Sequence, residues 1–227
     1  MIIGGFQKFS LIDYPGKIGA IVFTQGCNFR CPYCHNPELV KPRMFKEPIP
    51  EEIVLDFLEK RRGMLEGVVI TGGEPLLQKD LSIFLRNIKK MGYAIKLDTN
   101  GSFPERLKEI INDKLVDYIA MDIKAPLEKY GFISGVNVNT EDIRRSIKII
   151  MHSDLDYQFR TTVVKSLLSI EDVKKICELI NSARSYVLQK FKFNGKIIDS
   201  SLLNKEEYDE KGIKRFQDIV ANFIQGG

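Results

Sequence analysis

The stretch AIVFTQGCNFRCPYCHN, residues 20–36, joins a short apolar run to a loop that contains three cysteines. Residues 20–24 are apolar or β-branched, which is typical of a strand covered on both faces in a parallel sheet. Cys27, Cys31 and Cys34 follow with CxxxCxxC spacing. The stretch therefore predicts a buried strand whose carboxyl end leads into a loop of closely spaced thiols.

The pattern of a short apolar strand followed by an amphipathic helix repeats along the chain. Further strands are predicted at residues 67–71, 94–98, 118–122, 159–164 and 186–191. Helices are predicted at residues 51–62, 81–91, 104–112, 140–152, 170–183 and 205–224. Pro50 and Pro104 suit the first turn of a helix, and Thr140 suits an N-cap because two acidic residues follow it.

This alternation predicts an α/β fold with a parallel sheet. Six βα units indicate an open, partial (β/α)6 barrel. A doubly wound sheet is the alternative, because periodicity does not reveal strand order. A chain of 227 residues with 44% hydrophobic content is long enough for one sizeable core. We therefore expect one domain over residues 1–227, with an N-terminal extension at 1–18, βα repeats at 19–193 and a C-terminal helix at 204–224.

The charges of the chain are balanced and interspersed. Lys and Arg number 34 against 30 Asp and Glu, so no nucleic-acid partner is expected. The N-terminus lacks the pattern of a secretion signal, and no apolar run reaches membrane-spanning length, so a cytoplasmic protein without a membrane partner is expected. Thiols stay reduced in that compartment, which favours metal binding or catalysis over disulfides for the three cysteines.

Three kinds of metal site are compatible with the cysteine loop. Three thiolates within eight residues can bind one face of an iron–sulfur cubane and leave one iron without a protein ligand. A zinc site that adds His35 is the alternative, although adjacent ligands are unlike the usual separated pairs. The string CPYCH also has the form of a haem attachment site, which the absence of an export signal disfavours. The spacing therefore favours iron and sulfide.

The cysteine loop resembles the signature of radical S-adenosylmethionine enzymes, in which an aromatic residue, here Tyr33, precedes the last cysteine. SLIDYPGK at residues 10–17 and YCHN at 33–36 resemble the activating enzymes of pyruvate formate-lyase and of anaerobic ribonucleotide reductase, above all the short form of the latter. The resemblance implies a radical SAM type of partial barrel. It also implies a [4Fe–4S] cluster on Cys27, Cys31 and Cys34, as metal ligands and catalytic residues, with S-adenosylmethionine as the second cofactor.

Further motifs follow successive predicted strands. They are GGE at 72–74, DTNG at 98–101 and DIK at 122–124. Taken alone, each reads as a turn or a solvated charge pair. Glycine lets a backbone approach a ligand closely, and Glu74 could accept from an ammonium. The resemblance implies that these motifs contact S-adenosylmethionine. The candidate cofactor-binding residues are Tyr33, Cys34, His35, Gly72, Gly73, Glu74, Asp98, Thr99, Asn100, Asp122, Ile123, Lys124, Arg160 and Gln189.

Arg160 and Gln189 differ from the other candidates in their sequence context. Arg160 lies within a predicted strand, where its charge requires a partner such as Asp122 or a cofactor carboxylate. The formate-lyase activating enzymes have a histidine near the position of Gln189, and this departure favours the ribonucleotide-reductase type. Outside the site, Cys177 is predicted to be a core residue and His152 to lie at a helix end.

The resemblance implies a reaction as well as a site. S-adenosylmethionine is cleaved reductively to methionine and a 5′-deoxyadenosyl radical, which abstracts hydrogen from a glycine of a partner glycyl-radical enzyme. Anaerobic ribonucleotide reductase is the expected partner, and flavodoxin or ferredoxin is the expected electron donor. The alternative is an enzyme that acts on a small molecule, similar to 7-carboxy-7-deazaguanine synthase.

Overall fold

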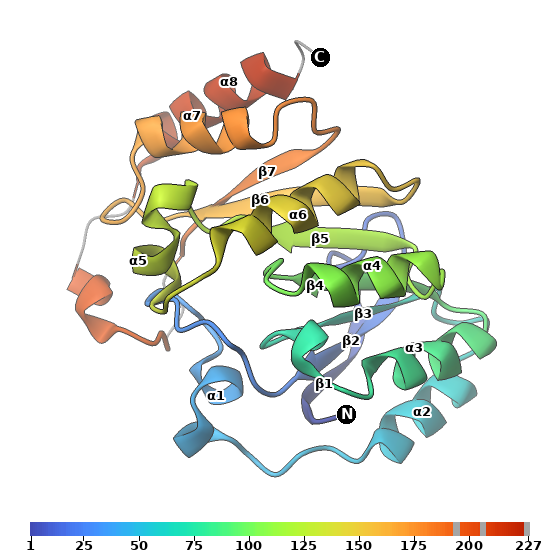
Figure 1. Ribbon diagram of the computed structural model, residues 1–227. Coiled ribbons are helices and arrows are strands. Elements are labelled where there is room, and N and C mark those ends of the chain that lie inside the picture. The colour runs from blue at the N-terminus through green and yellow to red at the C-terminus, as the bar shows by residue number, and fades with distance from the viewer. Residues whose placement is uncertain (193–195, 205–207, 225–227) are drawn as a thin grey trace.

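A computed structural model describes residues 1–192, 196–204 and 208–224 and contains a seven-stranded sheet (Figure 1). The strands follow one another in space in the same order as in the chain, and all neighbouring pairs are parallel except the first. They are Ile3–Ser10 (β1), Gly19–Thr24 (β2), Gly67–Gly72 (β3), Ala94–Thr99 (β4), Tyr118–Asp122 (β5), Asp156–Val163 (β6) and Tyr186–Lys190 (β7).

The strand order decides between the two predicted architectures. A doubly wound sheet reverses direction at a switch point, whereas here every crossover advances by one strand in the same direction. Figure 1 shows the connecting helices along one side of the sheet. Six parallel strands in sequential order, with the connecting helices on one side, form the open, partial barrel that was predicted.

Six of the described helices are longer than one or two turns. They are Glu51–Lys60 (α2), Leu81–Lys90 (α3), Pro104–Asn112 (α4), Thr140–Met151 (α6), Ile170–Leu179 (α7) and Glu210–Ile224 (α8). Two short helices, Pro37–Val40 (α1) and Tyr130–Ser134 (α5), and four 3-10 turns at Pro42–Met44, Pro75–Leu77, Leu127–Lys129 and Ser200–Asn204 lie between them. None of the described helices combines the length and the apolar character that crossing a membrane requires.

Several predicted boundaries were wrong by a few residues. Helix α7 ends at Leu179 rather than at 183, and α8 begins at Glu210, while the predicted start at 205 lies outside the described residues. Pro50 is the N-cap of α2 rather than part of its first turn. Asn139, not Thr140, caps α6, because its side chain accepts a hydrogen bond from the Glu141 amide.

The segment predicted as an N-terminal extension contributes a strand. Strand β1 pairs antiparallel with β2 and begins at Ile3, whose side chain is fully buried. Gly4, Gly5 and a polar, exposed end hide the strand pattern in the sequence. Residues 3–10 are therefore part of the sheet.

Apolar side chains fill both faces of the sheet at its amino end. The main core lies between the sheet and the helices and includes Ile70, Leu97, Ile119 and Phe159. On the opposite, concave face, Tyr14 packs with residues of β2 and β3 in a second apolar cluster. Polar residues gather instead at the carboxyl ends of the strands, and these ends hold the site.

The carboxyl ends of β2 and β3 approach each other very closely. Gly72 has a φ of +114°, and a Cβ there would lie 2.4 Å from the backbone nitrogen of Thr24. A Cβ on Gly73 would lie 1.9 Å from the carbonyl oxygen of Gly26. The Gly73 amide donates to the Thr24 carbonyl at 2.9 Å, and the Glu74 amide donates to that of Gly26 at 2.8 Å. The glycine pair therefore holds the cysteine loop against the end of β3.

This close approach predicts the effect of Gly72→Ala. Gly63, which has a φ of +75° and no atom within 4 Å of an added Cβ, is the matched control. Gly63→Ala should lower the free energy of unfolding by about 1–2 kcal/mol, because only the left-handed backbone conformation disfavours a side chain there. Gly72→Ala should lose about 1–3 kcal/mol more because of the clash with Thr24. Equal losses in urea titrations of the two variants would contradict this packing.

Candidate active site

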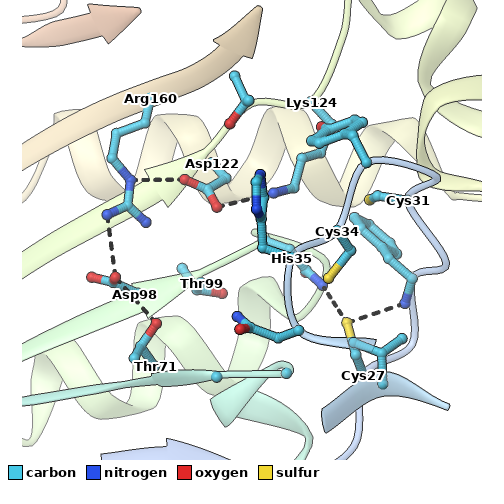
Figure 2. Close-up of a pocket in the computed structure, with 18 of the residues that line it drawn as sticks. Cys27, Cys31, Cys34, His35, Thr71, Asp98, Thr99, Asp122, Lys124 and Arg160 are labelled. Carbon is cyan, nitrogen blue, oxygen red and sulfur yellow. Dashed lines mark hydrogen bonds and ion pairs between the residues drawn. The ribbon is translucent and has the colours of Figure 1, made fainter. Parts of the chain in front are cut away.

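A cavity of about 280 Å³ lies at the carboxyl ends of the parallel strands, between the strands and the cysteine loop. Figure 2 shows side chains from both converging on it. All three cysteines line it, together with most of the predicted cofactor-binding residues. Those residues are Tyr33, Cys34, His35, Gly72, Gly73, Asp98, Thr99, Asn100, Asp122, Lys124, Arg160 and Gln189.

The cysteine loop is fixed by contacts with neighbouring segments. The Arg30 amide donates to the Ser134 carbonyl of α5 at 2.7 Å, and the Gly26 amide donates to the Leu39 carbonyl of α1 at 2.7 Å. The Arg30 guanidinium donates to the Cys27 carbonyl at 2.6 Å. The short helices α1 and α5, which the sequence did not predict, thus hold the loop in shape.

The thiols of this loop are largely buried. Cys31 is 7% exposed, and Cys27 and Cys34 are half-buried. Burial raises the pKa of Cys27 to about 12 and that of Cys31 to about 11, and it also raises the pKa of Cys34. The thiols therefore keep their protons at neutral pH until a metal displaces them.

The arrangement of the cysteines fits a cluster better than a single ion. Within residues 1–192, 196–204 and 208–224, no three His, Cys, Asp or Glu side chains converge on one metal position. A Cys₃His zinc site with His35 is therefore not preassembled. A four-iron cluster gives each thiolate a separate iron atom, so its ligands need not converge. Cys27 also accepts a hydrogen bond from the Phe29 amide at 3.4 Å, which suits a thiolate ligand.

Opposite the cysteines, an ion chain crosses three strands (Figure 2). Asp122 at the end of β5 contacts Lys124 Nζ at 2.9 Å and Arg160 Nε at 2.8 Å. Arg160 Nη1 reaches Asp98 of β4 at 3.2 Å. Although burial disfavours its charge, Arg160 and Lys124 hold the pKa of Asp122 well below its usual range. Arg160 thus has the partner that its partly buried charge requires.

Glu74 and Ile123 do not line the cavity, and both are fully buried. Glu74 Oε1 accepts from the Leu76 amide at 3.0 Å and from Thr99 Oγ1 at 2.8 Å, and Oε2 accepts from the Asn100 amide at 2.7 Å. The carboxylate predicted to meet a ligand ammonium therefore connects the end of β3 to the turn after β4.

Burial raises the pKa of Glu74 to about 7, in spite of the three hydrogen bonds that it accepts. In the unfolded chain this carboxyl has a pKa near 4.5, so folded protein binds more protons between these two values. Stability should therefore fall as pH rises through this window. Glu74→Gln removes this dependence. Its free energy of unfolding should therefore rise by about 3 kcal/mol relative to that of the wild type between pH 4.5 and 8. Urea unfolding of both apoproteins across this range measures it, and parallel pH profiles would refute it.

The cavity also contains features that the sequence prediction missed. Thr71 donates from Oγ1 to Asp98 at 3.2 Å, and Phe29 and Thr162 line the wall. The Tyr33 hydroxyl is buried in the wall without a hydrogen-bond partner among the described residues. Such a group is rare unless a ligand or water satisfies it, which supports the presence of a bound molecule in the functional protein.

The sequence prediction also did not include Lys96, which lies next to the site. Its side chain is 5% exposed, and its ammonium contacts Asp98 Oδ1 at 2.5 Å. A lysine two positions before Asp98 in an otherwise apolar strand was the available signal, because residues two apart share one face of a strand.

Residues 21–180 match the sequence model of the Radical SAM superfamily. The match covers most of the chain, so the protein belongs to the radical S-adenosylmethionine superfamily. It is an enzyme of radical chemistry that binds a [4Fe–4S] cluster and S-adenosylmethionine, as the sequence predicts.

Two relatives resemble the chain over nearly its whole length and are named as activating enzymes. One is a glycyl-radical enzyme activating enzyme of Methanocaldococcus jannaschii, 36% identical over 218 residues, which span 92% of this chain and 83% of the relative. The other is the pyruvate formate-lyase-activating enzyme of Clostridium pasteurianum, 28% identical over 240 residues and 98% of both chains.

Two further proteins match a smaller share of their own length. A 7-carboxy-7-deazaguanine synthase of Methanospirillum hungatei is 33% identical over 145 residues, which span 62% of this chain and 56% of that one. Among solved structures, SuiB of Streptococcus suis aligns with a TM-score of 0.65 at 15% identity, over 91% of this chain and 46% of that chain. This structural likeness concerns the fold.

Cys31→Ala should abolish assembly of the cluster, because it removes one of the three thiols in the cavity. Cys177→Ala is the matched control, since Cys177 is a buried core residue of α7, as predicted, and lies outside the cavity. Iron and sulfide analysis after anaerobic reconstitution measures the effect. Full iron content in Cys31→Ala, or equal loss in both variants, would contradict the ligand assignment.

Proposed function

We propose that this enzyme installs a glycyl radical on a partner protein and that the partner is an anaerobic ribonucleotide reductase. The observation that carries the proposal is the similarity to glycyl-radical enzyme activating enzymes over 92% and 98% of the chain. The synthase relative matches a shorter part of the chain. The reductase is favoured over formate-lyase as the partner because Gln189 stands where a histidine is expected.

The proposal assigns roles to the residues of the cavity. Cys27, Cys31 and Cys34 bind three irons of the cluster. The backbone of Gly72 and Gly73, which line the cavity, receives the amino group of S-adenosylmethionine. The remaining lining residues bind the rest of this cofactor, and Glu74 and Ile123 support them from behind the wall. The same proposal takes residues 1–227 as one domain, which is supported by a continuous core from Ile3 to Val220.

The ion chain orients the cofactor rather than reacting with it. Arg160 and Lys124 present cationic groups to the cavity, and both are held by Asp122. A carboxylate that binds there meets donors already fixed in place, so less freedom is lost on binding. Fixed orientation matters because a reactive radical must meet its target before it meets water or another side chain.

When bound, the reduced cluster would supply the electron for cleavage of S-adenosylmethionine to methionine and a 5′-deoxyadenosyl radical, and transfer of a hydrogen atom from a glycine Cα of the partner would give 5′-deoxyadenosine and the glycyl radical. The residues of this chain supply binding, orientation and exclusion of water. Flavodoxin or ferredoxin is the proposed electron donor.

A direct test combines reduced holoenzyme, S-adenosylmethionine and an anaerobic ribonucleotide reductase. Electron paramagnetic resonance should record a glycyl doublet, because removal of one hydrogen atom leaves an unpaired electron on a Cα that keeps one hydrogen. A reductase whose radical-site glycine is replaced by alanine is the control and should give no doublet.

Pyruvate formate-lyase in place of the reductase tests the choice of partner. A doublet with formate-lyase alone would reject the reductase while keeping the activating function. No doublet with either protein, together with ring contraction of a pterin by the enzyme alone, would reject the activating function in favour of the synthase-like alternative.

A further inference from the structure

Lys96 places a charged group inside the barrel, below the ligand cavity. In register it lies between Val69 of β3 and Tyr118 of β5, which both belong to the apolar cluster on the concave face. Its ammonium contacts Asp98 Oδ1 at 2.5 Å, and Asp98 lines the cavity. The aliphatic part of the Lys96 side chain therefore lies in the apolar layer, and its ammonium lies at the base of the cavity.

Burying this ammonium has a cost that the fold must offset. A charge removed from water is unfavourable unless it is paired and hydrogen-bonded. The side chains of Lys96 and Asp98 are 5% and 15% exposed. A methionine at position 96 would fill similar space without that cost, so packing alone does not account for a lysine. The charge itself must contribute.

Lys96 changes the charge of the ion chain at the strand ends. Without it, Asp98, Arg160, Asp122 and Lys124 form two cations and two anions. With it, three cations face two anions, and one positive charge is left over. An excess positive charge in a partly buried site is stabilised by an anionic ligand group.

Asp98 is also held on both of its oxygens. Oδ1 accepts from Lys96, and Oδ2 accepts from Thr71 and Arg160, each at 3.2 Å. Because Lys96 occupies Oδ1 of Asp98, Oδ2 remains available to Arg160. The Arg160 guanidinium, which lines the cavity, is thereby fixed. Removing Lys96 would free Asp98 to rotate and would leave its charge less compensated.

We propose that Lys96 is a positioning residue that acts as a built-in cation: it holds Asp98 and makes the ion chain net positive, ready for the carboxylate of S-adenosylmethionine. The inference rests on the proposed placement of this cofactor in the cavity. It does not depend on which glycyl-radical enzyme is the partner. The ammonium acts through Asp98 and Arg160 and does not touch the reacting atoms.

A built-in cation makes a specific prediction about added cations. Wild-type holoenzyme should bind S-adenosylmethionine with the same Kd, within about twofold, whether the buffer cation is bulky tetramethylammonium or about 0.1 M potassium or methylammonium. Lys96→Met should bind at least about tenfold more weakly in tetramethylammonium, because the ion chain has lost its excess charge. Methylammonium or potassium should restore most of this loss by taking the place of the missing ammonium beside Asp98 Oδ1, since methionine replaces only the aliphatic part of the lysine.

Two further variants make the test specific. Lys96→Arg keeps the charge and should bind nearly as the wild type does in tetramethylammonium. Lys89→Met is the matched control, since Lys89 also pairs with an aspartate, Asp117 at 2.7 Å, but on the outer surface away from the cavity. It should bind as the wild type does in all buffers. Anaerobic titration calorimetry on reconstituted protein measures the Kd without any partner protein.

Three results would overturn the proposal. The first is Lys96→Met binding as tightly as the wild type in tetramethylammonium. The second is a loss that neither small cation reverses, which would indicate a purely structural role. The third is a wild-type affinity that rises more than about fivefold on adding potassium, and it needs no variant that folds. A missing glycyl doublet would instead reject the partner assignment and leave these Kd values unaffected.

Discussion

The site depends first on the contact between the backbones of β2 and β3 at their carboxyl ends. Gly72 and Gly73 lie so close to Thr24 and Gly26 that any side chain would collide with the backbone opposite. This contact sets where the cysteine loop leaves the sheet, and therefore which wall of the cavity the thiols form. The remaining strands then add polar ends in chain order, because every crossover advances by one strand.

Each wall of the cavity is stabilised in a different way. The cysteine loop is held by backbone hydrogen bonds to two short helices, whereas the opposite wall is held by ion pairs across β4, β5 and β6. Glu74 links the two walls. It follows the glycine pair in the chain, and its carboxylate accepts hydrogen bonds from the turn after β4. A change on one wall is therefore expected to alter the other.

Much of this arrangement could be predicted from the sequence, because strands buried on both faces have a clear apolar pattern and their polar ends meet at one edge of a parallel sheet. Strand β1 could not, since Gly4, Gly5 and Lys8 obscure the pattern. Nor could α5, which is one short turn next to Arg30 and depends on a tertiary contact. The sequence identified Glu74 but not the direction of its carboxylate, which depends on turn geometry. It contained a signal for Lys96, two positions before Asp98 on the same face of the strand, but it did not show that this face points into the barrel.

The protonation of the thiols affects how the protein resists oxidation before its cluster is assembled. Oxidants and disulfides react with the thiolate, and a pKa of about 11 or 12 leaves a very small fraction of thiolate at neutral pH. The cysteine thiols of newly folded protein therefore stay unoxidised until iron and sulfide are available. Burial, which later shields a radical, thus also protects the empty loop from damage during maturation.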